Sequence, residues 1–251
     1  IGKKIISKKI IRNKVISFLP CKITDSQKKA LEKIELEMAD EKRMVHLLQG
    51  DVGSGKTIVA LLSMLTVIEA GYQCVLMAPT EILSKQHFLT FKKFLKDTNI
   101  TISLLAGNEK SSVRKKNLDD LSSGSSQVVI GTHSLFQEGV NFKNLGLVVI
   151  DEQQRFGVHQ RYLLASKGKK TNVLVMTATP IPRTLTLASF GDINVSCLRE
   201  KPVGRKDIIT RVVPISRFNN IILAIKNKIK NNERVYWVCP LIEESEILNL
   251  V

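Results

Sequence analysis

Residues 50–57 read Gly50-Asp51-Val52-Gly53-Ser54-Gly55-Lys56-Thr57, which fits the phosphate-loop pattern G-x-x-x-x-G-K-[ST]. A mostly apolar run at 44–48 precedes the loop and predicts a buried strand, and apolar side chains recur at helical spacing over 57–70. A strand, a glycine-rich loop and a helix in this order are the context that the pattern requires. We therefore expect the loop and the helix start to surround the phosphates of a nucleotide with backbone N–H groups.

Two side chains of the loop have expected roles with ATP and Mg²⁺. Lys56 is expected to reach the β- and γ-phosphates, and the Thr57 hydroxyl is expected to bind the metal ion. The alternative is a glycine-rich turn with a surface lysine, and the flanking strand and helix disfavour it.

Short apolar runs alternate with helical segments along most of the chain. The runs that predict further strands cover 74–78, 100–105, 128–130, 147–150 and 172–176. Such a pattern predicts an α/β fold, a parallel sheet with helices on both faces. Ligands bind beyond the carboxyl ends of the strands in sheets of this kind.

Polar residues follow several of these predicted strands. Asp151 and Glu152 follow the run at 147–150, where Asp151 can hold Mg²⁺ and Glu152 can orient and deprotonate the attacking water. Hydroxyls and N–H groups at the other strand ends can hold nucleic-acid phosphates or sense the γ-phosphate. The residues concerned are Thr80, Glu81, Thr132, His133, Thr177 and Thr179. For Thr177 and Thr179 a simple strand-end cap is the alternative, and for His133 a structural role is equally open.

The segment before the first strand holds one further candidate, Gln27. Thr24 to Gln27 has the spacing of a capping box at the start of a helix. Gln27 has two readings that the residues leave open, because its amide could cap the helix or bind the adenine edge. Farther upstream, residues 1–22 hold seven basic and no acidic residues and predict a basic amphipathic helix that Pro20 ends. That helix could pack on a partner upstream or be a solvated basic face.

The charge of the chain favours an anionic partner. Its 251 residues include 38 Lys and Arg against 23 Asp and Glu, a net charge of +15. The phosphates of ATP do not need such an excess, so nucleic acid is the leading candidate, with solvated surface lysines as the alternative.

The four cysteines are far apart and predict neither a disulfide framework nor a metal site. Cys74, Cys197 and Cys239 lie in apolar, strand-like runs and are expected to be core residues in a reducing cytosol, while Cys21 does not. The longest apolar stretch, 58–68, is too short to span a bilayer, so we expect a cytoplasmic protein without a membrane segment. Because the chain begins with Ile1, we expect it to be a piece of a longer protein.

Taken in order, these motifs resemble those of superfamily 2 helicases, with 50–57 as motif I, 78–87 as Ia, 131–133 as Ib, 151–155 as II and 177–180 as III. More narrowly, the chain is similar to the RecG family of bacterial branch-migration helicases. The strings that carry this similarity are at 78–83, 145–157, 177–184 and 240–246. The related translocase Mfd shares Thr-Ala-Thr-Pro-Ile-Pro-Arg-Thr but usually has Asp-Glu-Glu in motif II.

The resemblance implies a RecA-like lobe that drives ATP-dependent translocation on duplex or branched DNA in recombination and repair, with Gln27 binding adenine. It also implies that Gln154 and Arg155 couple ATP to DNA, although the family normally has His where Gln154 stands. An Mfd-like translocase, a remnant that binds ATP or DNA without turnover, and a small-substrate P-loop kinase are the alternatives.

The resemblance also predicts a domain organisation. We expect a basic helix or linker at 1–22, the lobe at 23–200, and a linker with the start of a second lobe at 201–251. In that last part we expect a strand at 207–213, a helix at 217–230 and a strand at 235–239. The family's wedge domain and its arginine finger are not in this sequence, so we expect this chain alone to hydrolyse little ATP. We also expect a monomer.

Overall fold

A computed structural model describes residues 2–105, 107, 111–136, 139–152, 170–179, 193–200, 202 and 209–238. The chain divides into two compact units, Ile1–Arg205 and Lys206–Val251.

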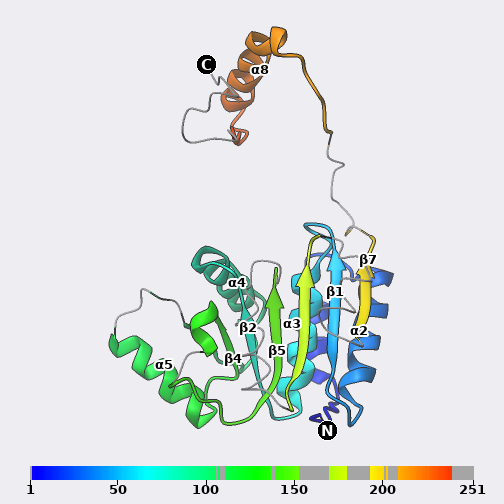
Figure 1. The fold of residues 1–251 in the computed structure, drawn as a ribbon, viewed down its shortest axis with the longest axis vertical. Coiled ribbons are helices and arrows are strands. Elements are labelled where there is room, and N and C mark those ends of the chain that lie inside the picture. The colour runs from blue at the N-terminus through cyan, green and yellow to red at the C-terminus, as the bar shows by residue number, and fades with distance from the viewer. Residues whose placement is uncertain are drawn as a thin grey trace. The chain divides into compact units, whose positions relative to one another are not determined.

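The first unit contains a seven-stranded sheet in which every neighbouring pair is parallel (Figure 1). In chain order the strands are β1 (Val45–Gly50), β2 (Gln73–Met77), β3 (Ile102–Leu105), β4 (Val128–Gly131), β5 (Leu145–Asp151), β6 (Asn172–Thr177) and β7 (Asn194–Leu198). Their spatial order is β3-β4-β2-β5-β6-β1-β7. The predicted parallel α/β sheet is confirmed, and β1, β5 and β6 lie side by side near its middle.

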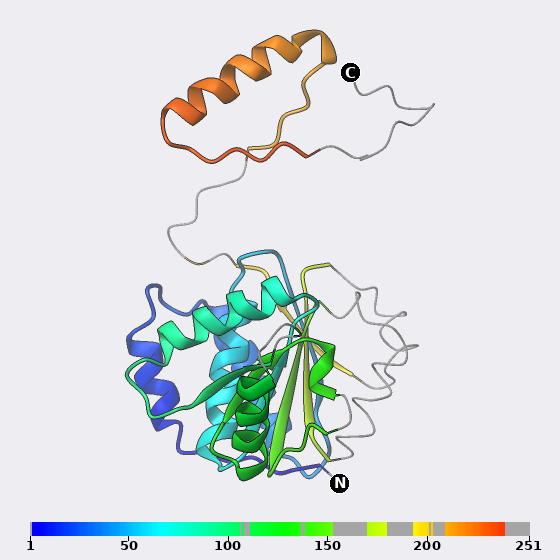
Figure 2. The same cartoon turned by 90° about the vertical axis from the view of Figure 1, so that its left-hand side faces the viewer.

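Helices pack on both faces of this sheet. On one face are α1 (Ile10–Ser17), α2 (Asp25–Met38), α3 (Lys56–Glu69) and α4 (Glu81–Phe94), as Figure 2 shows. Leu121 of α5 (Ser111–Ser123) packs into the core on the other face. Successive strand residues point to opposite faces of the sheet. Val149 therefore packs in the core beneath α1 to α4, and Val148 packs in the core that contains Leu121 of α5. Because both faces are covered, the inner strands of the sheet, such as β5 and β6, consist mostly of buried apolar residues.

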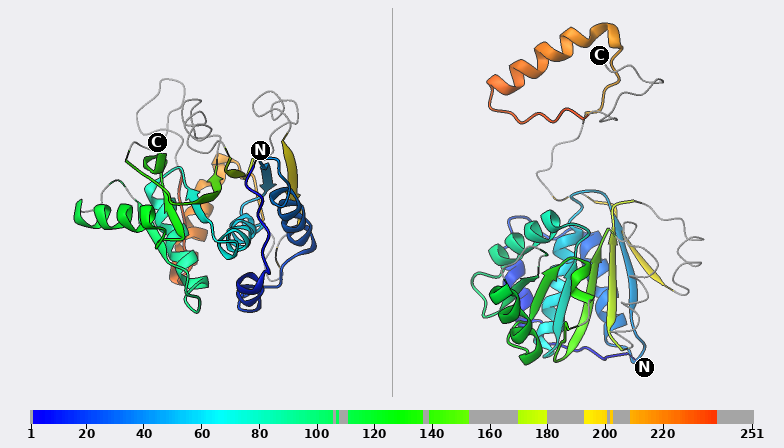
Figure 3. Two further views of the ribbon diagram at one scale, coloured as in Figure 1. Left: turned by 90° about the horizontal axis from the view of Figure 1, so that it is seen from below. Right: turned by 60° about the vertical axis from the view of Figure 1, so that its left-hand side comes forward.

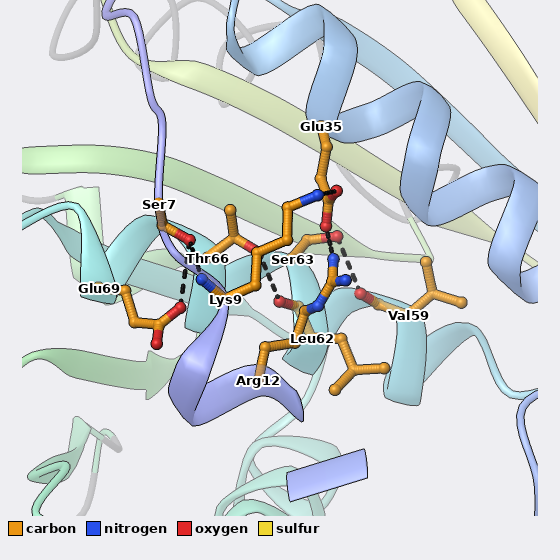
Figure 4. Close-up of polar contacts among 9 residues, drawn as sticks. All are labelled: Ser7, Lys9, Arg12, Glu35, Val59, Leu62, Ser63, Thr66 and Glu69. Carbon is orange, nitrogen blue, oxygen red and sulfur yellow. Dashed lines mark hydrogen bonds and ion pairs between the residues drawn. The ribbon is translucent and has the colours of Figure 1, made fainter. Parts of the chain in front are cut away.

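The N-terminal segment packs on α2 and α3 of its own unit (Figure 3, left). Val15 and Ile5 are only 1% and 2% exposed, and the helix itself covers just residues 10–17. Figure 4 shows Glu35 of α2 paired with Lys9 and Arg12, and Glu69 of α3 accepting a hydrogen bond from Ser7 Oγ. Glu69 also accepts from the Ile11 N–H. The reading of this helix as only a solvated basic face is therefore wrong.

The second unit contains the predicted helix, α8 (Phe218–Lys230), preceded by the 3₁₀ turn η3 (Ile215–Arg217). The Trp237 ring packs edge-on against Phe218, with centroids 5.6 Å apart. The two predicted strands are wrong where the structure describes them, because residues 209–214 and 233–238 form neither strand nor helix. A strand needs a neighbour for its N–H and C=O groups, and no described residue of this unit provides one.

One prediction about the cysteines is also wrong. Cys74 is buried in β2 as expected, but Cys197 is exposed because β7 is an edge strand with only Leu198 buried. Cys239 lies outside the described residues. Within the described part of the chain, no helix is long and apolar enough to cross a membrane.

Candidate functional site

The phosphate loop joins β1 to α3 at the carboxyl edge of the sheet. Gly53 and Gly55 have φ angles of 80° and 89°, in the left-handed region that glycine adopts without strain. A Cβ at Gly55 would lie 2.2 Å from Gln27 Nε2, and one at Gly50 would lie 2.5 Å from Ser54 Oγ. These glycines are therefore needed for the close approach of the surrounding groups as well as for the turn.

Lys56 begins α3 and its side chain turns back over the loop. Its Nζ donates to the carbonyl oxygens of Gly50, at 2.6 Å, and of Asp51, at 3.2 Å. Burial lowers the pKa of Lys56, while attraction to Glu152, Asp151 and Asp51 opposes that shift. The ammonium is thus held by neutral carbonyls within the field of three carboxylates, and it can neutralise a phosphate bound in the loop.

Asp151 and Glu152 lie at the same edge as the loop. The register pairs Asp151 with Met176 of β6, and Met176 in turn with Leu48 of β1. Asp151 is thus level with a residue two positions before Gly50, and its side chain is within electrostatic reach of Lys56. Glu152 has a φ of 50°, an uncommon value for a residue that is not glycine, and its N–H donates to Met176 O at 3.0 Å. Backbone in sparsely populated regions clusters at functional sites.

Asp151 has a partner to which the sequence analysis gave no role. His87 Nε2 lies 2.8 Å from Asp151 Oδ2, and the two residues are 8% and 9% exposed. The sequence does carry the signal, because Ser84, His87 and Phe91 share the buried face of α4 at helical spacing.

Gln27 makes three hydrogen bonds within the protein. It forms a capping box with Thr24, which confirms the predicted cap. Its Nε2 also donates to Ser54 O at 2.7 Å, so the start of α2 is bonded to the phosphate loop. The bond from Gln27 to Ser54 was not expected from the sequence.

Besides the phosphate loop, a second candidate site is a pocket of about 400 Å³ at the carboxyl ends of β2 and β4. It is lined by Pro79, Thr80, Glu81, Gly107, Arg114, Thr132 and Ser134. Thr80 caps α4 through a hydrogen bond from the Leu83 N–H, and Glu81 accepts from the Gly107 N–H at 3.0 Å. Three predicted residues, Thr80, Glu81 and Thr132, are thus brought together, and Arg114 of α5 adds a positive charge that the sequence analysis missed.

Of the remaining predicted residues, the structure describes the side chains of Thr177 and Thr179 only. Thr177 is buried, and its Oγ1 lies 3.1 Å from Thr179 Oγ1 and accepts from the Thr179 N–H, as a strand-end cap would. His133 begins the 3₁₀ turn η1 (His133–Phe136), but its side chain is not among the described ones. Gln154 and Arg155 lie outside the described residues.

The loop and its surroundings fit a nucleotide with Mg²⁺. Gly50 and Gly55 keep the loop clear of Cβ atoms, and Ser54 Oγ is buried without a hydrogen-bond partner among the described residues. Thr57 and Asp151 carry side-chain oxygens, the type of ligand that Mg²⁺ prefers. No cluster of three or more His, Cys, Asp or Glu that could hold a metal occurs in the described part of the chain.

Comparison with known proteins places the chain among helicases. Residues 24–187 match the family described as DEAD/DEAH box helicase. The chain is 47% identical over 250 residues to the ATP-dependent DNA helicase RecG of Thermotoga maritima, which is 100% of this chain and 32% of that protein. The corresponding values for the RecG of Aquifex aeolicus are 46% over 247 residues, 98% and 31%. The chain therefore spans about a third of the length of these curated relatives.

Several solved structures share this fold. The structure of RecG bound to a three-way DNA junction superposes with a TM-score of 0.81 at 43% identity, over 92% of this chain and 31% of that one. The DUF1998 helicase MrfA superposes with a TM-score of 0.63 at 18% identity, over 88% and 36%, and shows the fold alone.

Proposed function

The chain belongs to the DEAD/DEAH box helicase family, and we propose that it is the ATP-binding part of a RecG-type helicase that acts on branched DNA. One observation carries the proposal. The phosphate loop follows β1 and the Asp151-Glu152 pair stands at the end of β5, so both lie at one edge of the sheet with only β6 between their strands.

Four residues at this edge are proposed to act in phosphoryl transfer to water. Lys56 supplies positive charge to the β- and γ-phosphates, and Thr57 and Asp151 supply oxygen ligands to Mg²⁺. Bound Mg²⁺ would neutralise charge on these phosphates. Glu152 orients the attacking water and accepts its proton. Gln27 binds adenine in this proposal, which requires its amide to exchange the Ser54 contact for the base.

We propose that DNA phosphates bind the pocket at the carboxyl ends of β2 and β4. Thr80 and Thr132 provide hydroxyls there, and Arg114 provides a charge that pairs with phosphate. The net charge of +15 supports a polyanionic partner, and so does the similarity to a protein solved on a three-way junction. His133, Thr177, Thr179, Gln154 and Arg155 are proposed to couple this pocket to the nucleotide.

The nucleotide site can be tested by calorimetry with ATP and a non-hydrolysable analogue in the presence of Mg²⁺. Lys56→Ala should abolish measurable binding, because it removes the phosphate counter-charge. The matched control is Lys93→Ala, an exposed lysine near the end of α4, which should bind as the unaltered chain does. Equal affinity of the Lys56→Ala variant and the unaltered chain would show that the loop does not hold the phosphates.

A further inference from the structure

His87 reaches the acidic pair from a different part of the fold. Helix α4 follows β2, and β2 is hydrogen-bonded to β5, the strand that ends in Asp151. Helix α4 packs mainly on β3 and β4, which lie on the other side of β2 from β5. His87 is nevertheless the residue of its buried face whose ring meets the Asp151 carboxylate.

The contact leaves the two oxygens of Asp151 in different situations. A carboxylate can only accept hydrogen bonds, so His87 Nε2 must be the donor to Oδ2 at 2.8 Å. The bond restricts rotation of the carboxylate, because both groups are about nine-tenths buried. Oδ2 is thus held by His87, whereas no described residue donates a hydrogen bond to Oδ1, the oxygen that we assign to the ligand.

We propose that His87 is a positioning residue that orients Asp151 for Mg²⁺, an inference that rests on the proposed nucleotide site. Carboxylates that bind metal ions are usually held by a further hydrogen bond, and removing that bond typically costs about 10–100-fold in metal affinity. A histidine with a purely structural role would need only some hydrogen-bond partner for its ring nitrogens. His87 instead donates to the carboxylate that the site requires, and the charge of Asp151 acts on the Lys56 ammonium, where it opposes the lowering of the Lys56 pKa by burial.

Helix α4 also connects this contact to the second pocket. Thr80 caps the helix and Glu81 is its first residue, and both line the pocket of about 400 Å³, whereas His87 lies two turns farther along the same helix. The side chain that orients Asp151 is thus carried by the element whose beginning is proposed to meet DNA.

The test measures metal binding without turnover. Mn²⁺ replaces Mg²⁺, and electron paramagnetic resonance titration of the 251-residue chain with saturating ADP gives the Mn²⁺ affinity. We expect His87→Ala to weaken Mn²⁺ binding by about 10-fold or more, because Asp151 is no longer oriented. ADP affinity without metal should not change. His87→Gln should restore most of the metal affinity, since its amide nitrogen is a donor at a similar distance from the backbone.

A control separates positioning from packing. Phe91→Leu alters a fully buried residue one turn later on the same face of α4, away from Asp151, and it should leave the Mn²⁺ affinity unchanged. Circular dichroism confirms that each variant is folded. Unchanged metal affinity in His87→Ala would overturn the proposal, and so would a His87→Gln variant as weak as His87→Ala or an equal loss in Phe91→Leu.

Failure of the proposed function has a different signature. If the unaltered chain binds no more ADP than the Lys56→Ala variant, the nucleotide site is wrong, and the role of His87 is wrong with it. If Lys56→Ala loses ADP but His87→Ala keeps its Mn²⁺ affinity, only the role of His87 is wrong.

Discussion

Gln27 Nε2 donates a 2.7 Å hydrogen bond to the carbonyl oxygen of Ser54, and this bond joins the first turn of α2 to the phosphate loop. Since Gly55 approaches the same amide so closely that a Cβ would lie 2.2 Å from it, the helix and the loop are packed as well as bonded. The position of the loop therefore depends on a residue more than twenty positions earlier in the chain.

The first prediction concerns this bond. Gln27→Glu keeps an acceptor for the Thr24 N–H but removes the amide donor that holds Ser54 O or the bound base. We therefore expect nucleotide affinity to fall about 10-fold, as a lost hydrogen bond of roughly 1.4 kcal/mol would give. Thr24→Ala is the control, because it removes the helix cap at a cost of about 1 kcal/mol in stability but leaves the Ser54 contact. Its affinity should remain near that of the unaltered chain.

The same variant tests the adenine role of Gln27. If the amide binds adenine, Gln27→Glu should weaken ATP more than GTP. If the amide acts only through the loop, both nucleotides should weaken equally. Calorimetric titration with each nucleotide gives the ratio that decides between the two roles.

The second prediction concerns the ionic contacts of the N-terminal segment. Glu35→Ala leaves the Lys9 and Arg12 charges without their carboxylate, and the Arg12 side chain is only 14% exposed. We expect the free energy of unfolding to fall by about 3 kcal/mol, as when one partner of a buried ion pair is removed. Urea unfolding followed by circular dichroism measures this value.

The matched control is Asp25→Ala, which breaks the pair between Lys28 and Asp25, whose side chains are 59% and 77% exposed. An exposed pair should contribute less than about 1 kcal/mol. Equal losses in Glu35→Ala and Asp25→Ala would show that the contacts drawn in Figure 4 do not stabilise the fold.

The third prediction concerns DNA. Arg114→Gln should weaken binding to a branched duplex and lower the slope of log affinity against log salt by about 1, because one phosphate contact is lost. Lys42→Gln changes the charge by the same amount at an exposed position before β1, at the opposite edge of the sheet, and should leave the slope unchanged. Fluorescence anisotropy over a salt series measures both. If the two variants behave alike, DNA binding depends on the overall charge and not on this pocket.

The fourth prediction concerns thiol reactivity and pH. Burial raises the pKa of the Cys74 thiol well above the usual 9.0, whereas Cys21 and Cys197 are exposed. Peptide mapping after native alkylation should find Cys21 and Cys197 modified and Cys74 unmodified until urea is added. The Cys74 thiol ionises in the unfolded chain but stays protonated in the fold, so its contribution to stability should decline as the pH rises above 9.0. Rapid native alkylation of Cys74 would contradict its burial in β2.

Much of the site could be predicted because its residues stand next to strands in the sequence. A parallel sheet brings the carboxyl ends of its strands to one edge, so the position of Asp151 after an apolar run was enough to place it near the phosphate loop. Thr80 and Thr132 follow β2 and β4 in the same way, and these strands are neighbours in the sheet.

The contacts that the sequence did not predict come from helices and edges. Arg114 and His87 reach the strand ends from α5 and α4, and their direction depends on how each helix packs on the sheet. The exposure of Cys197 depends on β7 being the last strand, a property of strand order that the apolar run does not encode. The strand expected at 235–239 shows the same limit, since pairing needs a second strand in addition to a suitable composition.

The start of the described chain has a practical consequence for experiments. The Gly2 N–H donates to Glu41 O, and the Lys3 N–H donates to Lys170 O. These bonds hold the segment at the edge of the sheet where the strands begin, and Figure 1 marks the N-terminus there. A biotin tag or a fluorophore joined ahead of Gly2 would therefore leave the first unit on the side away from the phosphate loop. Surface immobilisation through such a tag should keep the carboxyl edge open to nucleotide and DNA during single-molecule recording.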